Sequence, residues 1–338
     1  MRPSISIASI VALCVVAGSA LMSRAVADDR DTCANRTGDE SIAACTRAIM
    51  SGRWLGAELA WAYANRGAEY RSKGDYERAI ADANEALRLD PTYASAYVIR
   101  GNVYTEKGDY DRAIANQNEA IRLDPQLVAA YYNRGMAYRA KGDYARAIAD
   151  YSEAIRLAPA FAGAYSNRCF ARAIIGQLES ALGDCDESLR LQPGHANTLD
   201  TRGMAYLKLG ELDDAIIDYD AALRLSPNKA SSLYGRGLAL LRSGETLRGN
   251  GDVSAARAIE ADIVDRFARY GIGLGVEGAD RARRFQSPAP TPECARAETH
   301  WLSVEEIRTV AAYRDHLARF PTCDFAALAA ARIQALTR

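Results

Sequence analysis

Two cysteines, Cys169 and Cys185, have a residue type and a spacing that could do chemistry. They lie in a stretch whose neighbours are repetitive and lack cysteine. Two thiols at this distance can act as a redox pair, contribute to a metal site or form a structural disulfide. A metal site needs further ligands, but His195, His300 and His316 form no cluster at ligand spacing. We therefore predict no metal site, which leaves a redox-active pair or a structural brace.

No motif of a common catalytic class is present in the sequence. It contains neither a G-x-S-x-G nucleophile turn nor a G-x-x-x-x-G-K phosphate loop. We therefore predict that the chain is not an enzyme and needs no cofactor, and an enzyme acting through unrecognised carboxylates is the alternative. Against that alternative, four aspartates recur at one repeated position, as scaffold residues do: Asp82, Asp150, Asp184 and Asp218.

The first 27 residues have the pattern of an export signal. Arg2 precedes an apolar run from Ile5 to Met22, and Ala25-Val26-Ala27 offers small residues for cleavage after Ala27. An uncleaved anchor is the alternative, because about 18 apolar residues can just span a bilayer. Cleavage would leave a periplasmic or secreted protein without a membrane contact.

Export also affects how the cysteines are interpreted. Cleavage would remove Cys14 and leave an even number of cysteines in an oxidising compartment, where disulfides are expected. The simplest connectivity joins neighbours along the sequence: Cys33–Cys45, Cys169–Cys185 and Cys294–Cys323.

The overall composition is that of a soluble globular protein. Of its 338 residues, 49% are hydrophobic and 25% charged, and the formal net charge is −1. This balance provides no basic field, so we expect no nucleic-acid partner.

A fixed period organises most of the chain. Residues 130–159 show one unit, in which two helix-favouring segments flank Lys141-Gly142-Asp143. Gly142 suits a left-handed helix end, and Asp143 suits the N-cap of the second helix. Proline follows the second helix every 34 residues, a spacing typical of a helical repeat array: Pro91, Pro125, Pro159, Pro193 and Pro227.

At these residues the chain resembles the tetratricopeptide repeat family. The third unit matches every position of the family pattern, with Tyr131, Gly135, Tyr138, Ala147, Tyr151, Ala154 and Pro159. The resemblance implies an all-α, right-handed solenoid of helical hairpins. It covers residues 60–229 as five full repeats, which begin at Ala60, Ala94, Val128, Ala162 and Ala196.

The segments at the two ends of the array are predicted to differ from the regular repeats. A degenerate sixth repeat begins at Ala230, with about seven extra residues expected before Gly251-Asp252 and no closing proline. The expected domains are a signal at 1–27, a disulfide-bonded cap at 28–59, the solenoid at 60–270, a linker at 271–293 and a helical hairpin at 294–338. In that hairpin, Ser303–Glu306 forms a capping box, one helix ends near Arg319, and another spans about 325–337.

An arginine precedes the glycine position of every repeat. In an antiparallel hairpin, the seventh residue lies near the twenty-third, where most repeats carry an aspartate. We expect structural pairs within about 4 Å, and an anion-binding stripe is the alternative. The predicted pairs are Arg66–Asp82, Arg134–Asp150, Arg168–Asp184 and Arg202–Asp218, and Arg100 is expected to bond Asn116.

The geometry of a hairpin also bears on the two cysteines of repeat four. Cys169 replaces the glycine of the other repeats, and Cys185 lies opposite it in a hairpin that turns near Gly176. We therefore expect a disulfide between the two helices, with Cα atoms about 4.4–6.8 Å apart. A redox-active pair remains the alternative, although burial would disfavour its thiolate.

The family resemblance also implies a groove lined by the first helices at repeat positions 2, 5, 9 and 12. These positions vary between repeats, and the central ones are apolar or aromatic, which suits a peptide or an amphipathic helix. The same positions also hold Gly163, Ser166, Asn197 and Ser231. The candidate groove residues are Trp61, Arg71, Val98, Asn102, Tyr132, Met136, Arg139, Phe170, Asp200, Met204, Tyr234 and Leu238.

The predicted function is a protein-interaction scaffold that binds a peptide segment of a partner protein. The lysines that chaperone-binding members of the family carry at positions 2 and 5 are missing, so that specificity is not expected. The alternative is a structural or assembly subunit whose hairpin at 294–338 docks onto another molecule or onto the solenoid, so that the groove is filled. For the apolar groove residues, the alternative to an exposed surface is that they pack against each other or against that hairpin.

Overall fold

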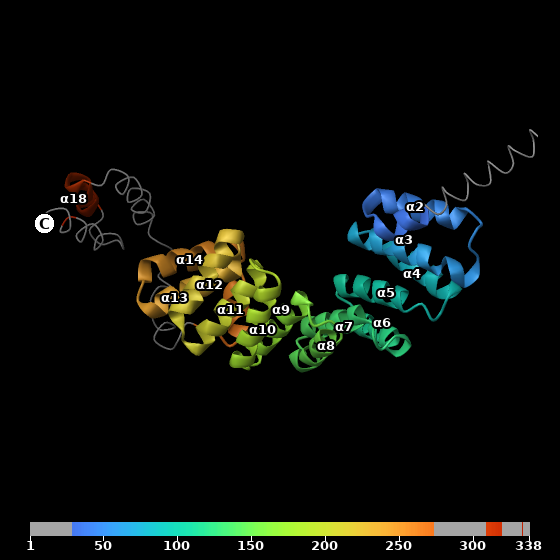
Figure 1. Cartoon of the computed structure of the whole chain (residues 1–338). Helices are drawn as coiled ribbons and strands as arrows, with labels where there is room; N and C mark the ends of the chain where they lie inside the picture. The colour runs from blue at the N-terminus through green and yellow to red at the C-terminus, as the bar shows by residue number, and fades with distance from the viewer. Residues whose placement is uncertain (1–28, 274–308, 320–332, 334–338) are drawn as a thin grey trace, which may run out of the picture. The chain divides into compact units, whose positions relative to one another are not determined.

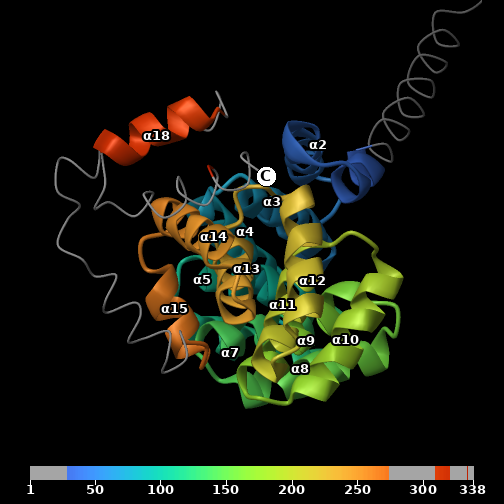
Figure 2. The same cartoon turned by 90° about the vertical axis from the view of Figure 1, so that its left-hand side faces the viewer.

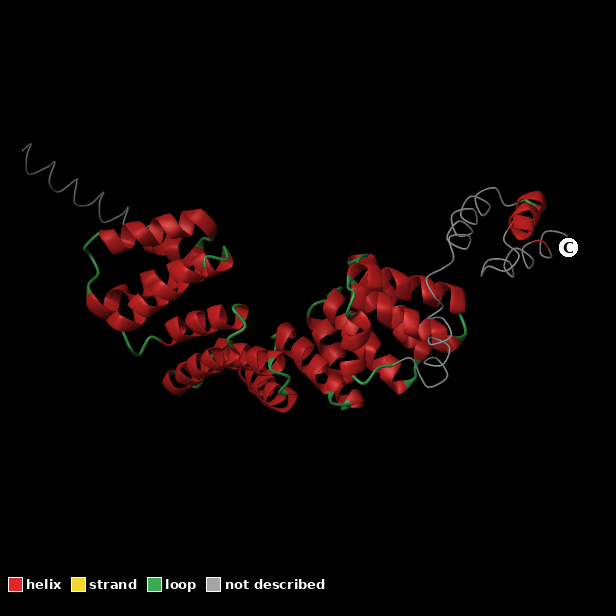
Figure 3. Cartoon of the chain, turned by 180° about the vertical axis from the view of Figure 1, so that it is seen from behind, coloured by secondary structure: helices red, strands yellow, loops and turns green. Residues whose placement is uncertain are grey.

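The computed structural model describes residues 29–273, 309–319 and 333 (Figure 1). These parts contain helices and loops, and none of them forms a strand (Figure 3). The chain divides into two compact units, the first reaching Gly271 and the second beginning at Ile272. In the second unit, α18 (Val310–Arg319) begins after Thr309, which is not helical and whose hydroxyl accepts a hydrogen bond from the backbone N–H of Ala312 at 3.2 Å, so the expected helix does not continue unbroken from Ser303–Glu306. Apart from Thr309 and Ile333, the rest of the expected hairpin, including Cys294 and Cys323, lies outside the described residues, as does the export signal.

The N-terminal cap of the first unit is helical. Residues 29–35 form a helix, followed by α2 (Gly38–Met50) and the short η1 (Gly56–Leu59). The predicted Cys33–Cys45 disulfide is confirmed, with Cα atoms 4.8 Å apart. It is buried with Ala44, and α2 packs on the first helix of the array. The cap therefore covers the apolar side of the first repeat.

Six helical hairpins follow the cap, and each packs on the next. Their helices are α3 (Ala60–Ser72) and α4 (Tyr76–Leu89), α5 (Ala94–Glu106) and α6 (Tyr110–Leu123), α7 (Val128–Ala140) and α8 (Tyr144–Leu157), α9 (Ala162–Ile174) and α10 (Leu178–Leu191), α11 (Ala196–Leu209) and α12 (Leu212–Leu225), and α13 (Ala230–Ser243) and α14 (Thr246–Ile259).

The turn within each hairpin follows the local sequence as expected. Gly142 adopts a φ of 79°, a left-handed conformation that suits glycine, and ends α7. Asp143 then accepts a hydrogen bond from the backbone N–H of Arg146 at 3.1 Å and so caps α8. Asp75 and Asp109 cap α4 and α6 in the same way.

The sixth repeat corrects one expectation. It has no seven-residue insertion, because its turn lies at Gly244 and α14 begins at Thr246, in phase with α12. The sequence Gly251-Asp252 resembles a turn but lies inside α14. Asp252 instead occupies the aspartate position of the repeat and pairs with Arg236 at 2.6 Å. The sixth repeat is therefore a regular hairpin.

Contacts between repeats differ on the two sides of the array. First helices touch the first helices of the next repeat, as α7 touches α9 and α9 touches α11. Second helices make no comparable contacts with one another among the described residues. Since the first helices are closer together, they form the inner, concave side of the first unit. A site formed by several repeats is therefore expected on the first helices.

The arginine ladder is confirmed, and it also joins neighbouring repeats. Arg134 donates to both carboxylate oxygens of Asp150, at 2.9 and 2.7 Å. Its remaining nitrogen, Nη1, donates to Asn118 of the preceding repeat at 2.7 Å. This two-sided arrangement recurs along the array, through Arg100 with Asn116 and Asn84, Arg168 with Asp184 and Ser152, Arg202 with Asp218 and Asp186, and Arg236 with Asp252 and Asp220. Arg66 likewise joins Asp82 to Thr46 of the cap.

Candidate functional site

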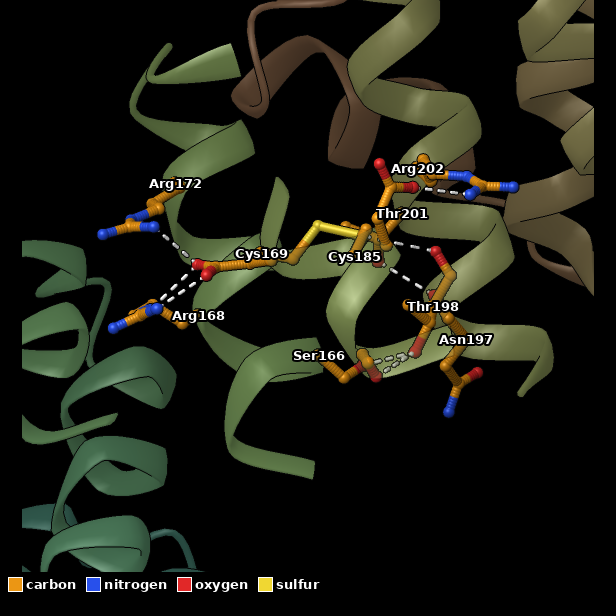
Figure 4. Close-up of a disulfide and its surroundings, with 12 residues drawn as sticks. Ser166, Arg168, Cys169, Arg172, Cys185, Asn197, Thr198, Thr201 and Arg202 are labelled. Atoms are coloured by element: carbon orange, nitrogen blue, oxygen red, sulfur yellow. Dashed lines mark hydrogen bonds and ion pairs between the residues drawn. A yellow bond between two sulfur atoms is a disulfide. The ribbon is translucent and has the colours of Figure 1, made fainter. Parts of the chain in front are cut away.

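The pair Cys169–Cys185 forms a disulfide that joins α9 to α10 (Figure 4). The Cα atoms are 5.4 Å apart, within the predicted range, and neither residue is exposed. Thiol–disulfide exchange requires access to a sulfur atom. The burial therefore supports the structural brace over the redox-active pair. No cluster of metal-ligating side chains occurs in the described part of the chain.

Polar side chains surround the disulfide on the side of the next repeat. Thr198 Oγ1 donates to Ser166 Oγ at 2.8 Å (Figure 4). The same Oγ1 lies 2.7 Å from His195 Nδ1. Cys185 Sγ lies 3.6 Å from the Thr198 carbonyl oxygen. The disulfide thus joins α9 to α10, and Thr198 of α11 contacts both helices through Ser166 and Cys185.

A pocket of about 460 Å³ lies on the concave side of the first unit. Its walls come from the first helices α7, α9, α11 and α13, and from α15 (Ile263–Arg269), a short helix after the sixth repeat. Five predicted groove residues line it: Tyr132, Arg139, Phe170, Asp200 and Met204. The prediction therefore brought together residues from three successive repeats that share one site.

One end of the pocket is a polar network around Asp200. Its carboxylate accepts hydrogen bonds from Ser231 at 2.8 Å and Ser232 at 2.6 Å, and Lys229 Nζ lies 3.7 Å away. Lys229 also donates to Asn197 at 2.8 Å. Burial raises the pKa of Asp200, while Lys229 and the two serines act in the opposite direction. This end can hydrogen-bond a polar ligand through groups that are already oriented.

The other end of the pocket is aromatic and carries Arg139. The guanidinium of Arg139 lies over the Phe170 ring, 5.4 Å from its centroid. Tyr270 contacts the same ring edge-on, with the two centroids 5.7 Å apart. Tyr132 accepts a hydrogen bond from Asn167 at 2.8 Å, which fixes its hydroxyl. Burial raises the pKa of Tyr132, so its hydroxyl stays protonated and uncharged at physiological pH.

The helix α15 closes one side of the pocket. It packs beside α13 (Figure 2), with the Phe267 ring edge-on to Tyr234 at a centroid distance of 4.8 Å. After the helix, the carbonyl oxygen of Tyr270 accepts a hydrogen bond from Lys208 Nζ at 3.0 Å. Lys208 also donates to the carbonyl oxygens of Ala173 and Ile174 at the end of α9. Burial lowers its pKa, and these three acceptors hold the segment against repeats four and five.

Two predicted groove residues are removed from the surface by this helix. Tyr234 is 2% exposed and Leu238 is fully buried, so neither can contact a partner in this structure. The expectation of an accessible apolar surface at these positions is therefore wrong. The physical reason is that α15 brings Phe267 against Tyr234, and Ile263 is also fully buried there.

Five further predicted residues have other surroundings. Trp61 packs on the Cys33–Cys45 cap and edge-on to Trp54. Arg71 pairs with Glu106 at 2.6 Å. Val98 is buried with Ala120 and Ala130, Asn102 accepts from Gln117 at 3.0 Å, and Met136 packs on the Tyr138–Tyr151 core. None of these five lines the pocket.

Sequence reasoning missed the contribution of α15. Arg266, Phe267 and Tyr270 line the pocket but lie beyond the sixth repeat. A signal was present, because Ile263 and Phe267 have helical spacing directly after α14. The pocket also contains Asn167, His195, Thr201 and Lys229, which lie outside the four groove positions of the repeat.

Comparison with known proteins supports the repeat assignment. Tetratricopeptide repeat patterns match residues 60–93, 83–115 and 128–161, and a TPR repeat pattern matches 101–138 and 203–244. A search of curated proteins gives no match. No helix in the described ranges is long and apolar enough to span a membrane.

Solved structures share the fold at low sequence identity. PilW, whose structure is described as that of a type IV pilus biogenesis factor, is 20% identical with a TM-score of 0.55, over 60% of this chain and 93% of PilW. The Pseudomonas aeruginosa pilF protein is 19% identical with a TM-score of 0.54, over 60% and 92% of the two chains. A Parabacteroides merdae repeat protein is 17% identical with a TM-score of 0.53, over 74% and 99%. Together with the matched repeats, the folded hairpins place this chain in the tetratricopeptide repeat family.

Proposed function

We propose that this protein is a non-enzymatic adaptor that binds a peptide segment of a partner protein in its concave pocket. The observation that carries the proposal is the pocket itself, which the first helices of four successive repeats and α15 build together. A volume of about 460 Å³ suits a few side chains of a peptide. Its position on an inner surface suits an extended segment that crosses several repeats.

The composition of the walls supports a peptide ligand. Phe170 and Tyr270 provide apolar surface, whereas Asn197 and Ser231 can bond a peptide backbone. Such a mixture of apolar walls with a few placed polar groups is usual for ligand sites. Scaffold pairs already use the recurrent aspartates that could have suggested catalysis, such as Asp150 and Asp218. This supports binding over hydrolysis or group transfer.

The cell envelope is the proposed location. Two buried disulfides, Cys33–Cys45 and Cys169–Cys185, are compatible with an oxidising compartment. They agree with the export signal expected at residues 1–27. The partner would then be an envelope or extracellular protein.

An assembly subunit that covers its own groove is the second candidate. The observation that favours it is α15, which already occupies the concave side of repeat six and buries Tyr234 and Leu238. In this second case, the pocket would be completed by another segment of the same chain, such as the hairpin at 294–338. A pocket filled from within would leave no room for a partner peptide.

Site-specific photo-crosslinking in cells separates the two candidates. A photoreactive residue replaces Asn197, which lines the pocket, or Ile217, which is 62% exposed on the second helix α12. We expect the Asn197 probe to capture a partner that mass spectrometry identifies, and the Ile217 probe to miss it. Crosslinks from Asn197 only to residues 294–338 of the same chain would support the assembly subunit instead.

The purified partner then provides a quantitative test. Phe170→Ala removes a pocket wall and should weaken binding by at least about tenfold, as truncation of an aromatic anchor does. Ile217→Ala is the matched control and should bind like the wild type. Equal affinities for both variants, with native circular dichroism spectra, would remove the pocket from the interaction.

A further inference from the structure

Arg139 is the cation of the pocket that has no carboxylate partner among the described residues. It lies in the last turn of α7, and none of the ion pairs in the described parts includes it. Its Nε is buried and has no hydrogen-bond partner there. An unpaired charge in a partly buried position is costly, because protein groups replace water only in part. An anionic group of a ligand would therefore balance the charge of Arg139.

The repeat period supplies an internal comparison. Arg71 occupies the same repeat position as Arg139, two repeats earlier, and pairs with Glu106 of the following repeat at 2.6 Å. The residue that corresponds to Glu106 in the repeat after Arg139 is Ile174, which carries no charge. The array therefore retains the arginine at this position but lacks the counter-ion. A scaffold ion pair accounts for Arg71, whereas Arg139 has no ion pair among the described residues and lies over the Phe170 ring of the next repeat.

The other charges of the pocket have partners. Arg266 pairs with Glu260 at 2.9 Å, and Lys229 lies between Asp200 and Asn197. The pocket carboxylate, Asp200, is held by its two serines. A ligand carboxylate would therefore meet one cation that no carboxylate of the described residues balances and whose Nε has no hydrogen-bond partner there.

We infer that Arg139 binds a carboxylate of the peptide ligand, supplied by an acidic side chain or by the chain terminus, next to an apolar residue. This inference rests on the proposed function and names the chemistry of its ligand. A guanidinium can donate two parallel hydrogen bonds to a carboxylate. The rings of Phe170, Tyr270 and Tyr132 form the adjoining wall and suit an apolar side chain beside the acid.

Small probes test this recognition without a known partner. The probes are acetyl-Phe-Glu-amide, which carries a side-chain carboxylate, acetyl-Phe, which carries a terminal one, and the neutral acetyl-Phe-Gln-amide. Side-chain NMR of the full chain follows the arginine Nε–H signals during titration. We expect at least one acidic probe to shift the Arg139 signal with saturation, and the neutral probe to bind at least about tenfold more weakly. The tighter of the two acidic probes identifies the source of the carboxylate.

Matched variants complete the test. Arg139→Gln should abolish saturable binding of the acidic probe, whereas Arg71→Gln, at the same repeat position, should leave it unchanged. Equal binding by wild type and Arg139→Gln, or no shift of the Arg139 signal by either acidic probe, would overturn the inference. The proposed function would survive that failure if the crosslinked partner still required Phe170. Circular dichroism shows whether each variant is folded.

Discussion

The disulfide Cys169–Cys185 provides a quantitative test of how the array is held together. Repeat one has glycine and alanine at the same two positions, Gly67 and Ala83, and folds without a bond there. The double variant C169G/C185A therefore inserts a pair that the chain already uses elsewhere. It removes the brace and leaves the hairpin sequence otherwise unchanged.

The magnitude follows from the length of the closed loop. The two cysteines are separated by 16 positions in sequence, and the chain-entropy relation gives about 3 kcal/mol for a loop of this length. Both residues are fully buried, so their smaller replacements leave unfilled volume that costs about 1 kcal/mol more. We expect the free energy of unfolding to fall by about 3–4 kcal/mol. The change should be concentrated near repeat four, because repeats interact chiefly with their neighbours.

Urea unfolding followed by circular dichroism measures the total loss in the free energy of unfolding. Hydrogen exchange with mass spectrometry shows which helices are destabilised. Faster exchange is expected in α9 and α10 and in the helices that contact them. The variant C33A/C45A is the control, because its bond closes a loop of similar length, with a separation of 12, at the end of the array. That variant should accelerate exchange in α2 and α3 instead. A loss below about 1 kcal/mol for C169G/C185A, or exchange unchanged in α9 and α10, would refute the brace.

Two further predictions concern the charges of the scaffold. Arg134→Leu should lower the free energy of unfolding by about 2 kcal/mol, since it leaves the 7%-exposed Asp150 side chain without its two charged donors. R134L/D150L should recover part of that loss in urea unfolding, and a double variant less stable than the single one would contradict this account. The side-chain hydrogen bond from Arg146 lowers the pKa of Asp143 below the usual 3.8, so its charge stabilises the fold above that pH and the effect disappears as the pH falls through the folded pKa. Asp143→Asn should therefore be less stable than the wild type at neutral pH, and the difference in the free energy of unfolding should shrink only as the pH falls below 3.8. A difference that stays constant down to lower pH would exclude the charge as the cause.

The repeat period of the sequence predicted the features that depend on which residues lie opposite each other within one hairpin. The turn at Gly142-Asp143, the Arg134–Asp150 pair and the Cys169–Cys185 bond all follow from which residues of two antiparallel helices lie opposite each other. The same logic failed in repeat six, where a second glycine–aspartate dipeptide resembles the turn. There, Gly244 supplies the turn and Asp252 completes the ladder.

The site was predicted less well because its walls depend on more than the repeat. A groove position shows which helix face a residue occupies, but not what later segment packs on that face. Tyr234 and Phe170 occupy comparable groove positions, yet Tyr234 is covered by Phe267 while Phe170 lines the pocket. The difference arises from α15, which follows the last repeat and so lies outside the periodic pattern. Burial of this kind requires the folded arrangement of the chain.

Departures from the period therefore identify sites better than the periodic residues do. A periodic residue has a scaffold explanation in every repeat, as the arginines of the ladder do. Cys169 and Cys185 depart together and explain each other, since their bond replaces a packing solution used elsewhere. Arg139 occupies the repeat position of Arg71, but the position that supplies Glu106 to Arg71 holds Ile174 in the repeat after Arg139, so no carboxylate of the described residues balances Arg139. We propose that a partner supplies the missing group at this unbalanced position on the concave side, which makes Arg139 the residue at which the proposed binding can be tested most directly.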